Sequence, residues 1–164
     1  MYTGSIFEND IKELDPRKSY KYLGIEESFD VQHKNEKEKL KKKYLRRLRL
    51  VLGTELSAKS KIQTNGSLAV PVLRYSFGIV KWHQEELQNL DRKTRKLLTI
   101  HGQRHPKADG YRLYVPRKQG GRSLMQLEAA HAGEITKLVE YVDKKEDPLI
   151  QVVRTRQLSS VRDS

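Results

Sequence analysis

The sequence contains no cysteine, which excludes a disulfide framework, thiolate zinc sites and a cysteine nucleophile. It also lacks a long apolar run, because Pro71, Arg74 and Gly78 interrupt its most apolar stretch well short of the ~20 residues needed to cross a bilayer. Near the N-terminus, Glu8 and Asp10 stand where a signal peptide needs an apolar segment. We therefore expect an intracellular protein that does not enter a membrane, with nucleus and cytoplasm both open.

Residues that carry out chemistry are scarce as well. His101 and His105 have the four-residue spacing of a helical metal site, but a glycine and a proline break the helix there. Glu26 and Glu27 are adjacent in an expected strand, so their side chains point to opposite faces and cannot hold one metal ion together. We expect no catalytic residues, no metal site and no cofactor bound by this chain.

What the sequence has in excess is positive charge. The net charge is +12, and residues 31–64 carry 11 basic and 3 acidic side chains, followed by 12 and 4 in residues 65–122. Both ends of the chain are close to neutral or slightly acidic. A central basic block of this kind is typical of polyanion binding. The alternative interpretation is a solubilising surface that has no partner.

Hydrophobic periodicity predicts a mainly α-helical chain with a lean core, since only 36% of its residues are hydrophobic. Helices are predicted at 34–52, 58–80, 84–100 and 123–142. In the first, an apolar stripe that includes Tyr44 runs beside a cationic face. In the second, Gly66 costs ~1 kcal/mol relative to alanine. Pro71 removes a backbone donor and should kink or divide the same helix.

The remaining segments predict turns and loops. Runs at 6–14 and 20–27 flank a turn at Pro16 and predict a β-hairpin. Residues 101–122 are rich in glycine and proline and predict a loop. Within it, residues 116–122 surround a glycine pair with cations on a flexible backbone that could approach phosphates, although they do not form a Walker loop. The expected organisation is a hairpin over 1–30, a bundle over 31–101, a connection loop and helix over 102–145, and a flexible tail over 146–164.

Several segments, taken in order, resemble the reverse transcriptases of non-LTR retrotransposons. The resemblance covers residues 18–128 and rests on YKYLGI at 20–25, KIQ at 61–63, AVPVLRYSFGI at 69–79, DRKTRK at 91–96, HPKAD at 105–109, and RLYVPRK at 112–118 followed by GGR at 120–122. The sequence departs from the family pattern at residues 64–68, 110–111, 119 and 123.

The resemblance implies the primer grip, the thumb and the connection of an RNA-directed DNA polymerase. In that family the catalytic aspartates lie upstream of the primer grip, and nothing before Tyr20 supplies them, so this chain alone is expected to be inactive. The Mg²⁺ of the reaction belongs to the complete parent enzyme. The expected fold is mainly α, with an N-terminal β-hairpin, a thumb-like bundle of three to four helices, a loop-rich connection and a frayed C-terminal tail.

The expected partners are RNA, DNA or an RNA–DNA hybrid, and the missing fingers–palm domain. The residues proposed to bind nucleic acid are Tyr22, Leu23 and Gly24 of the primer grip, together with Lys39, Lys42, Arg46, Arg49, Arg92, Lys96, Arg117, Lys118 and Arg122. The alternative function is a helical protein-interaction module or a co-opted remnant that no longer binds nucleic acid.

Overall fold

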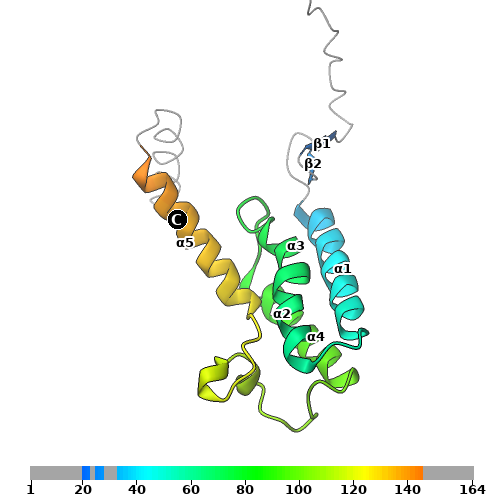
Figure 1. Ribbon diagram of the computed structural model, residues 1–164. Helices are drawn as coiled ribbons and strands as arrows, with labels where there is room; N and C mark the ends of the chain where they lie inside the picture. Colours follow the sequence, from blue (N-terminus) through cyan, green and yellow to red (C-terminus); the bar gives the residue numbers. More distant parts are fainter. Residues whose placement is uncertain (1–19, 23–24, 28–32, 146–164) are drawn as a thin grey trace, which may run out of the picture.

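The structure, a computed structural model, describes residues 20–22, 25–27 and 33–145 and is mainly α-helical (Figure 1). Strands β1 (Tyr20–Tyr22) and β2 (Ile25–Glu27) pair antiparallel, with Tyr20 opposite Glu27. The run at 6–14, which was expected to form a hairpin with 20–27, lies outside the described residues, as does the expected tail at 146–164.

Helix α1 (His33–Leu52) is the long basic helix that the periodicity predicts. Its inner face buries Tyr44, Leu48 and Leu52 almost completely. The helix ends where Gly53 donates its backbone N–H to the carbonyl of Arg49 over 2.9 Å.

The segment predicted as one helix over 58–80 is divided into three pieces. These are α2 (Ala58–Thr64), a π-helical turn η1 (Asn65–Ala69) and α3 (Val70–Arg74). Pro71 has no N–H with which to continue the regular ladder, and the wider turn before it lets the Val70 N–H bond to the Asn65 carbonyl instead. The division expected from the proline is confirmed.

The predicted end of this segment is wrong, because α3 stops at Arg74 and not at residue 80. The hydroxyl of Ser76 donates to the carbonyl of Leu73 over 2.6 Å and so competes with the next helical bond. The same hydroxyl accepts the indole N–H of Trp82 at 3.0 Å. Phe77 and Val80 are still buried, but from the turn that follows the helix.

Helix α4 (Gln84–Ile100) has the predicted bounds. At its C-terminal end Gly102 adopts a positive φ of 66°, and the Gln103 N–H reaches back to the Leu98 carbonyl over 2.8 Å. This bond is typical of the Schellman motif, which glycine favours at the C-terminal end of a helix.

After α4, the chain runs through two short 3₁₀ turns, η2 (Tyr111–Leu113) and η3 (Arg117–Gln119), into α5 (Leu127–Lys144). The predicted start of this last helix at residue 123 is wrong. Ser123 has a positive φ of 56°, outside the right-handed helical region, so it cannot belong to α5, which begins at Leu127. Helix α5 packs on α4 and α3 near its start and then projects beyond them (Figure 1).

The core lies where α1, η1, α3 and α4 meet, and the start of α5 and the connection close it at one end. Much of this core comes from the segment predicted as one helix over 58–80. Its buried apolar residues are Ile62, Ala69, Val70, Val72, Leu73, Phe77 and Val80.

Candidate nucleic-acid interface

The cations proposed on α1 form one exposed stripe along the helix. Lys39, Lys42, Arg46 and Arg49 are all exposed. Lys42 and Arg46 each stand two residues from the buried Tyr44, so they lie roughly 200° around the helix from it. The stripe is thus opposite the packed face, and not adjacent to it as the sequence suggested.

The stripe carries little compensating negative charge. Lys39 forms an ion pair with Glu36 at 3.3 Å. Within residues 33–145, Lys42, Arg46 and Arg49 form no ion pair with a carboxylate. Arg46 and Arg49 also border a shallow groove at the end of α1.

Arg92 and Lys96 are exposed on α4, but they face away from the α1 stripe. Each stands two residues from Thr94, which is buried. Thr94 meets Tyr44 of α1 across the helix interface, with 2.9 Å between the Tyr44 hydroxyl and Oγ1 of Thr94. The two cationic stripes therefore lie on the outer sides of two helices whose inner sides touch. A single straight duplex cannot lie along both.

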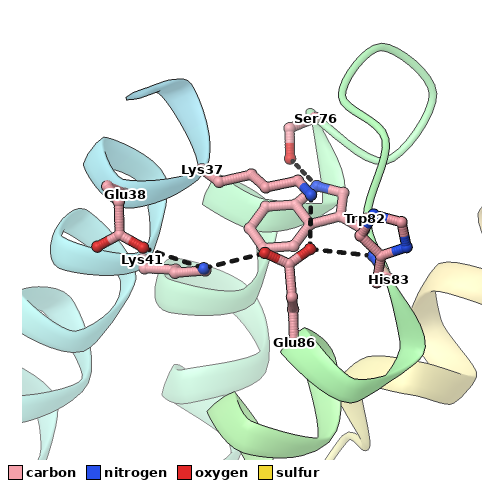
Figure 2. A network of polar contacts seen from close by, with 7 residues as sticks. All are labelled: Lys37, Glu38, Lys41, Ser76, Trp82, His83 and Glu86. Atoms are coloured by element: carbon pink, nitrogen blue, oxygen red, sulfur yellow. Dashed lines mark hydrogen bonds and ion pairs between the residues drawn. The ribbon is translucent and has the colours of Figure 1, made fainter. Parts of the chain in front are cut away.

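Two further lysines of α1 are used to hold the bundle together (Figure 2). Glu86 of α4 accepts from Lys37 at 2.5 Å and from Lys41 at 3.2 Å, and it also accepts the backbone N–H of His83 at 3.1 Å. Both ammonium groups lie within 6 Å of the Trp82 ring centre, at 5.8 and 5.9 Å.

This network sets the charge state of Glu86. Burial on its own would raise the pKa of the carboxyl group, but the three donors outweigh it and lower the pKa of Glu86 to about 2. Part of the positive charge counted in the sequence is therefore neutralised inside the protein.

The third predicted group, Arg117, Lys118 and Arg122, lies in the connection with cations that the sequence reasoning did not single out. Arg117 and Arg122 line a cavity of about 510 Å³ between the start of α2 and the connection, and Lys59, Arg104 and Arg112 line it as well. Lys118 does not line it. The density of arginine over 104–122 was the available signal, but only the folded chain brings Lys59 to it.

The glycine-bearing loop at the edge of this cavity is closed by backbone hydrogen bonds. Residues 112–115 run beside 122–124, joined by backbone bonds that include Ser123 N–H to Val115 O at 2.9 Å and Leu124 N–H to Leu113 O at 2.8 Å. Gly121 lies so close to Val115 that a Cβ would overlap the Val115 carbonyl. The amides of Gly120 and Gly121 bond to carbonyls within the loop, so the side chains offer the donors here and the backbone does not.

In the segment DRKTRK at 91–96, some side chains pack inside the protein and others are exposed. Asp91 and Thr94 are buried, and the half-buried Arg95 donates to the Tyr114 hydroxyl at 2.7 Å. Asp91 is 3% exposed and its two carboxyl oxygens accept the backbone N–H of Leu127 at 3.3 and 3.2 Å. A side chain of α4 thus caps the first turn of α5, a role that no local pattern reveals.

No family model matches this chain, and no curated protein or solved structure matches it. Among the described residues, no group of three or more His, Cys, Asp or Glu side chains is placed to hold a metal ion. None of the described helices is both long enough and apolar enough to span a bilayer.

Of the proposed primer-grip residues, Tyr22 lies at the end of β1, opposite Ile25. Leu23 and Gly24 lie outside the described residues. The predicted nucleic-acid residues thus fall into separate groups: the α1 stripe, the α4 stripe, the connection and the hairpin.

Proposed function

We propose that this chain is a nucleic-acid-binding thumb and connection segment of a non-LTR-type reverse transcriptase, which grips a template–primer duplex through its phosphate backbone. It has no catalytic carboxylates of its own in this proposal. The hairpin of β1 and β2 is the counterpart of the primer grip, and the bundle of α1 to α4 is the counterpart of the thumb.

The observation that carries the proposal is the α1 stripe. Its cations run from Lys39 to Arg49, a span of ~15 Å at 1.5 Å per residue. One strand of a duplex presents about four phosphates over that length. Helix α1 is also anchored on its inner face by Tyr44 and the Glu86 network, so the stripe is held on a rigid support. An A-form hybrid suits such backbone contacts, because its shape and phosphates are more accessible than its base edges.

The test is a salt titration of binding to a labelled RNA–DNA hybrid. We expect a linear fall of log affinity with log salt, to which each neutralised phosphate contributes about 0.7–0.9. The double variant Arg46→Glu/Arg49→Glu should weaken binding and reduce the slope by about 1.4–1.8.

The matched control is Arg92→Glu/Lys96→Glu, which makes the same charge change on the opposite side of the bundle. This control should keep most of the slope if the duplex lies along α1. Equal losses in both variants would mean that only net charge matters, and an unchanged affinity in both would refute the nucleic-acid track.

A second candidate, docking to another protein segment, is favoured by α5. Its projecting half exposes Leu138, Val139 and Tyr141, at 45%, 50% and 55% of their full area. Such side chains gathered on one short stretch are a feature of interaction sites. A chain that elutes as a monomer and keeps α5 resistant to protease without a partner would argue against this candidate.

A further inference from the structure

We propose that the cavity between α2 and the connection is a phosphate-binding site, separate from the duplex track on α1. Its defining residues are Lys59, Arg104, Arg112, Arg117 and Arg122. Its volume of about 510 Å³ lies in the range of small-ligand pockets. Such pockets are mostly apolar, whereas this one is ringed by cations, so its ligand is an anion.

The charge balance of the cavity is strongly one-sided. Asp109 is the one carboxylate among the described residues that line it. One of its oxygens accepts the backbone N–H of Tyr111 at 3.0 Å. Within the described part of the chain, none of the five cations forms an ion pair with a carboxylate. Cations that converge without carboxylate partners repel one another, and an anion between them relieves that repulsion.

Three of the guanidinium groups are fixed in place by the loop itself. Arg112 donates through Nε to the Gly120 carbonyl at 3.1 Å. Arg104 donates to the Ala108 carbonyl and Arg122 to the Gln103 carbonyl. Each guanidinium has five N–H donors, so one bond to the loop orients the group and leaves others for a ligand. Nε of Arg104 is buried and has no hydrogen-bond partner in the described structure.

The remaining two cations complete the ring from different elements. Lys59 comes from the first turn of α2 and Arg117 from the 3₁₀ turn η3, and both are exposed. The loop that carries Arg117 is closed by its ladder of backbone bonds, which hold this wall of the cavity together. Fixed, planar guanidinium donors around a small volume match the oxygens of a phosphate group.

Two sources can supply that group: a small phosphate anion, or the terminal phosphate of a nucleic-acid strand. The probes are pyrophosphate, measured by calorimetry, and a short labelled single strand with either a 5′-phosphate or a 5′-hydroxyl, measured by anisotropy at constant ionic strength. The test variant is Lys59→Gln/Arg117→Gln, since neither side chain holds the loop. The control is Lys93→Gln/Lys107→Gln, which removes two positive charges from exposed residues that do not line the cavity and are not among the proposed nucleic-acid contacts.

We expect one of the phosphate probes to bind the full chain, with affinity about tenfold or more weaker in the test variant and unchanged in the control. Preference for the 5′-phosphorylated strand over its 5′-hydroxyl twin identifies a strand end as the ligand, and equal binding of the two strands with tight pyrophosphate identifies a small anion. The proposal is overturned if neither phosphate is bound, or if the control loses as much as the test variant. Pyrophosphate binding should survive Arg46→Glu/Arg49→Glu, so this result is separate from that of the α1 track.

Discussion

The Tyr44 hydroxyl lies 2.9 Å from Oγ1 of Thr94, and this contact sets how α1 and α4 face each other. Thr94 donates its own hydroxyl proton to the Leu90 carbonyl at 2.9 Å, so Tyr44 is the donor in the pair. Both side chains are at most 1% exposed. The contact lies between the packed sides of the two helices, so both cationic stripes face outward.

Removing the Tyr44 hydroxyl should destabilise the protein without changing its charge at neutral pH. Tyr44→Phe leaves a buried acceptor on Thr94 without its donor, which costs about 1 kcal/mol in the free energy of unfolding. Urea unfolding monitored by circular dichroism measures this loss. In Tyr44→Phe/Thr94→Val the losses should be smaller than the sum of the single variants, because the two residues share one bond. Strict additivity would contradict the contact.

Because Asp91 caps α5, two substitutions of this residue should differ in their effect on stability. Asp91→Ala removes the acceptor of the Leu127 N–H and should cost about 1 kcal/mol, as loss of a helix cap usually does. Asp91→Asn keeps an amide oxygen in the same place and should retain most of that stability. Urea unfolding at pH 7 compares the two, and equal losses would mean that the carboxylate charge, and not the accepted bond, fixes the start of α5.

The same residue gives a pH dependence of known sign. Burial raises the pKa of Asp91 to about 6, above the 3.8 of an unperturbed carboxyl, although the Leu127 N–H works in the other direction. The folded state therefore binds the proton more readily than the unfolded chain. The contribution of Asp91 to stability falls as the pH rises from about 4 to about 6. This slope should be absent in Asp91→Asn.

Glu86 predicts the reverse dependence at lower pH. Its pKa of about 2 lies below the 4.5 of an unperturbed carboxyl, so its stabilisation is complete above about pH 4.5 and is lost as the pH falls towards 2. Glu86→Gln should cost roughly 1–3 kcal/mol at pH 7, because Lys37 and Lys41 lose a charged acceptor in a partly buried network.

Glu38→Gln is the matched control for this substitution. Glu38 also pairs with Lys41, at 3.1 Å, but its side chain is 57% exposed. Its loss should stay below about 0.5 kcal/mol, as for other surface pairs. Similar losses at Glu38 and Glu86 would show that burial of the network does not matter.

The helices were predictable from the sequence where one local rule acts alone. The apolar period predicted α1 and α4 with bounds that the structure confirms to within one residue. The prediction failed where contacts distant in sequence decide the backbone. Ser76 ends α3 by bonding to Leu73 and accepting from Trp82, and Asp91 sets the start of α5 from another helix. A period of 3.6 residues contains no information about such partners.

The sequence predicted which basic residues make up the candidate site. It did not predict how those residues are arranged in space. Counting charges located the basic block, but it did not reveal that Lys37 and Lys41 form ion pairs with Glu86. Nor did it reveal that the cations of α1 and α4 face apart. The cavity in the connection joins Lys59 to arginines more than forty positions later, and such a meeting depends on how α2 packs against the loop.

The capping of α5 by Asp91 also bears on insertions and deletions. The two residues joined by this contact are 36 positions apart, and most of the chain between them after α4 is surface loop. Because Asp91 fixes the first turn of α5 from the side of α4, a change of loop length would leave the start of α5 in place. Such a change near 104–110 would instead disturb the cavity, where Arg104 donates to the Ala108 carbonyl.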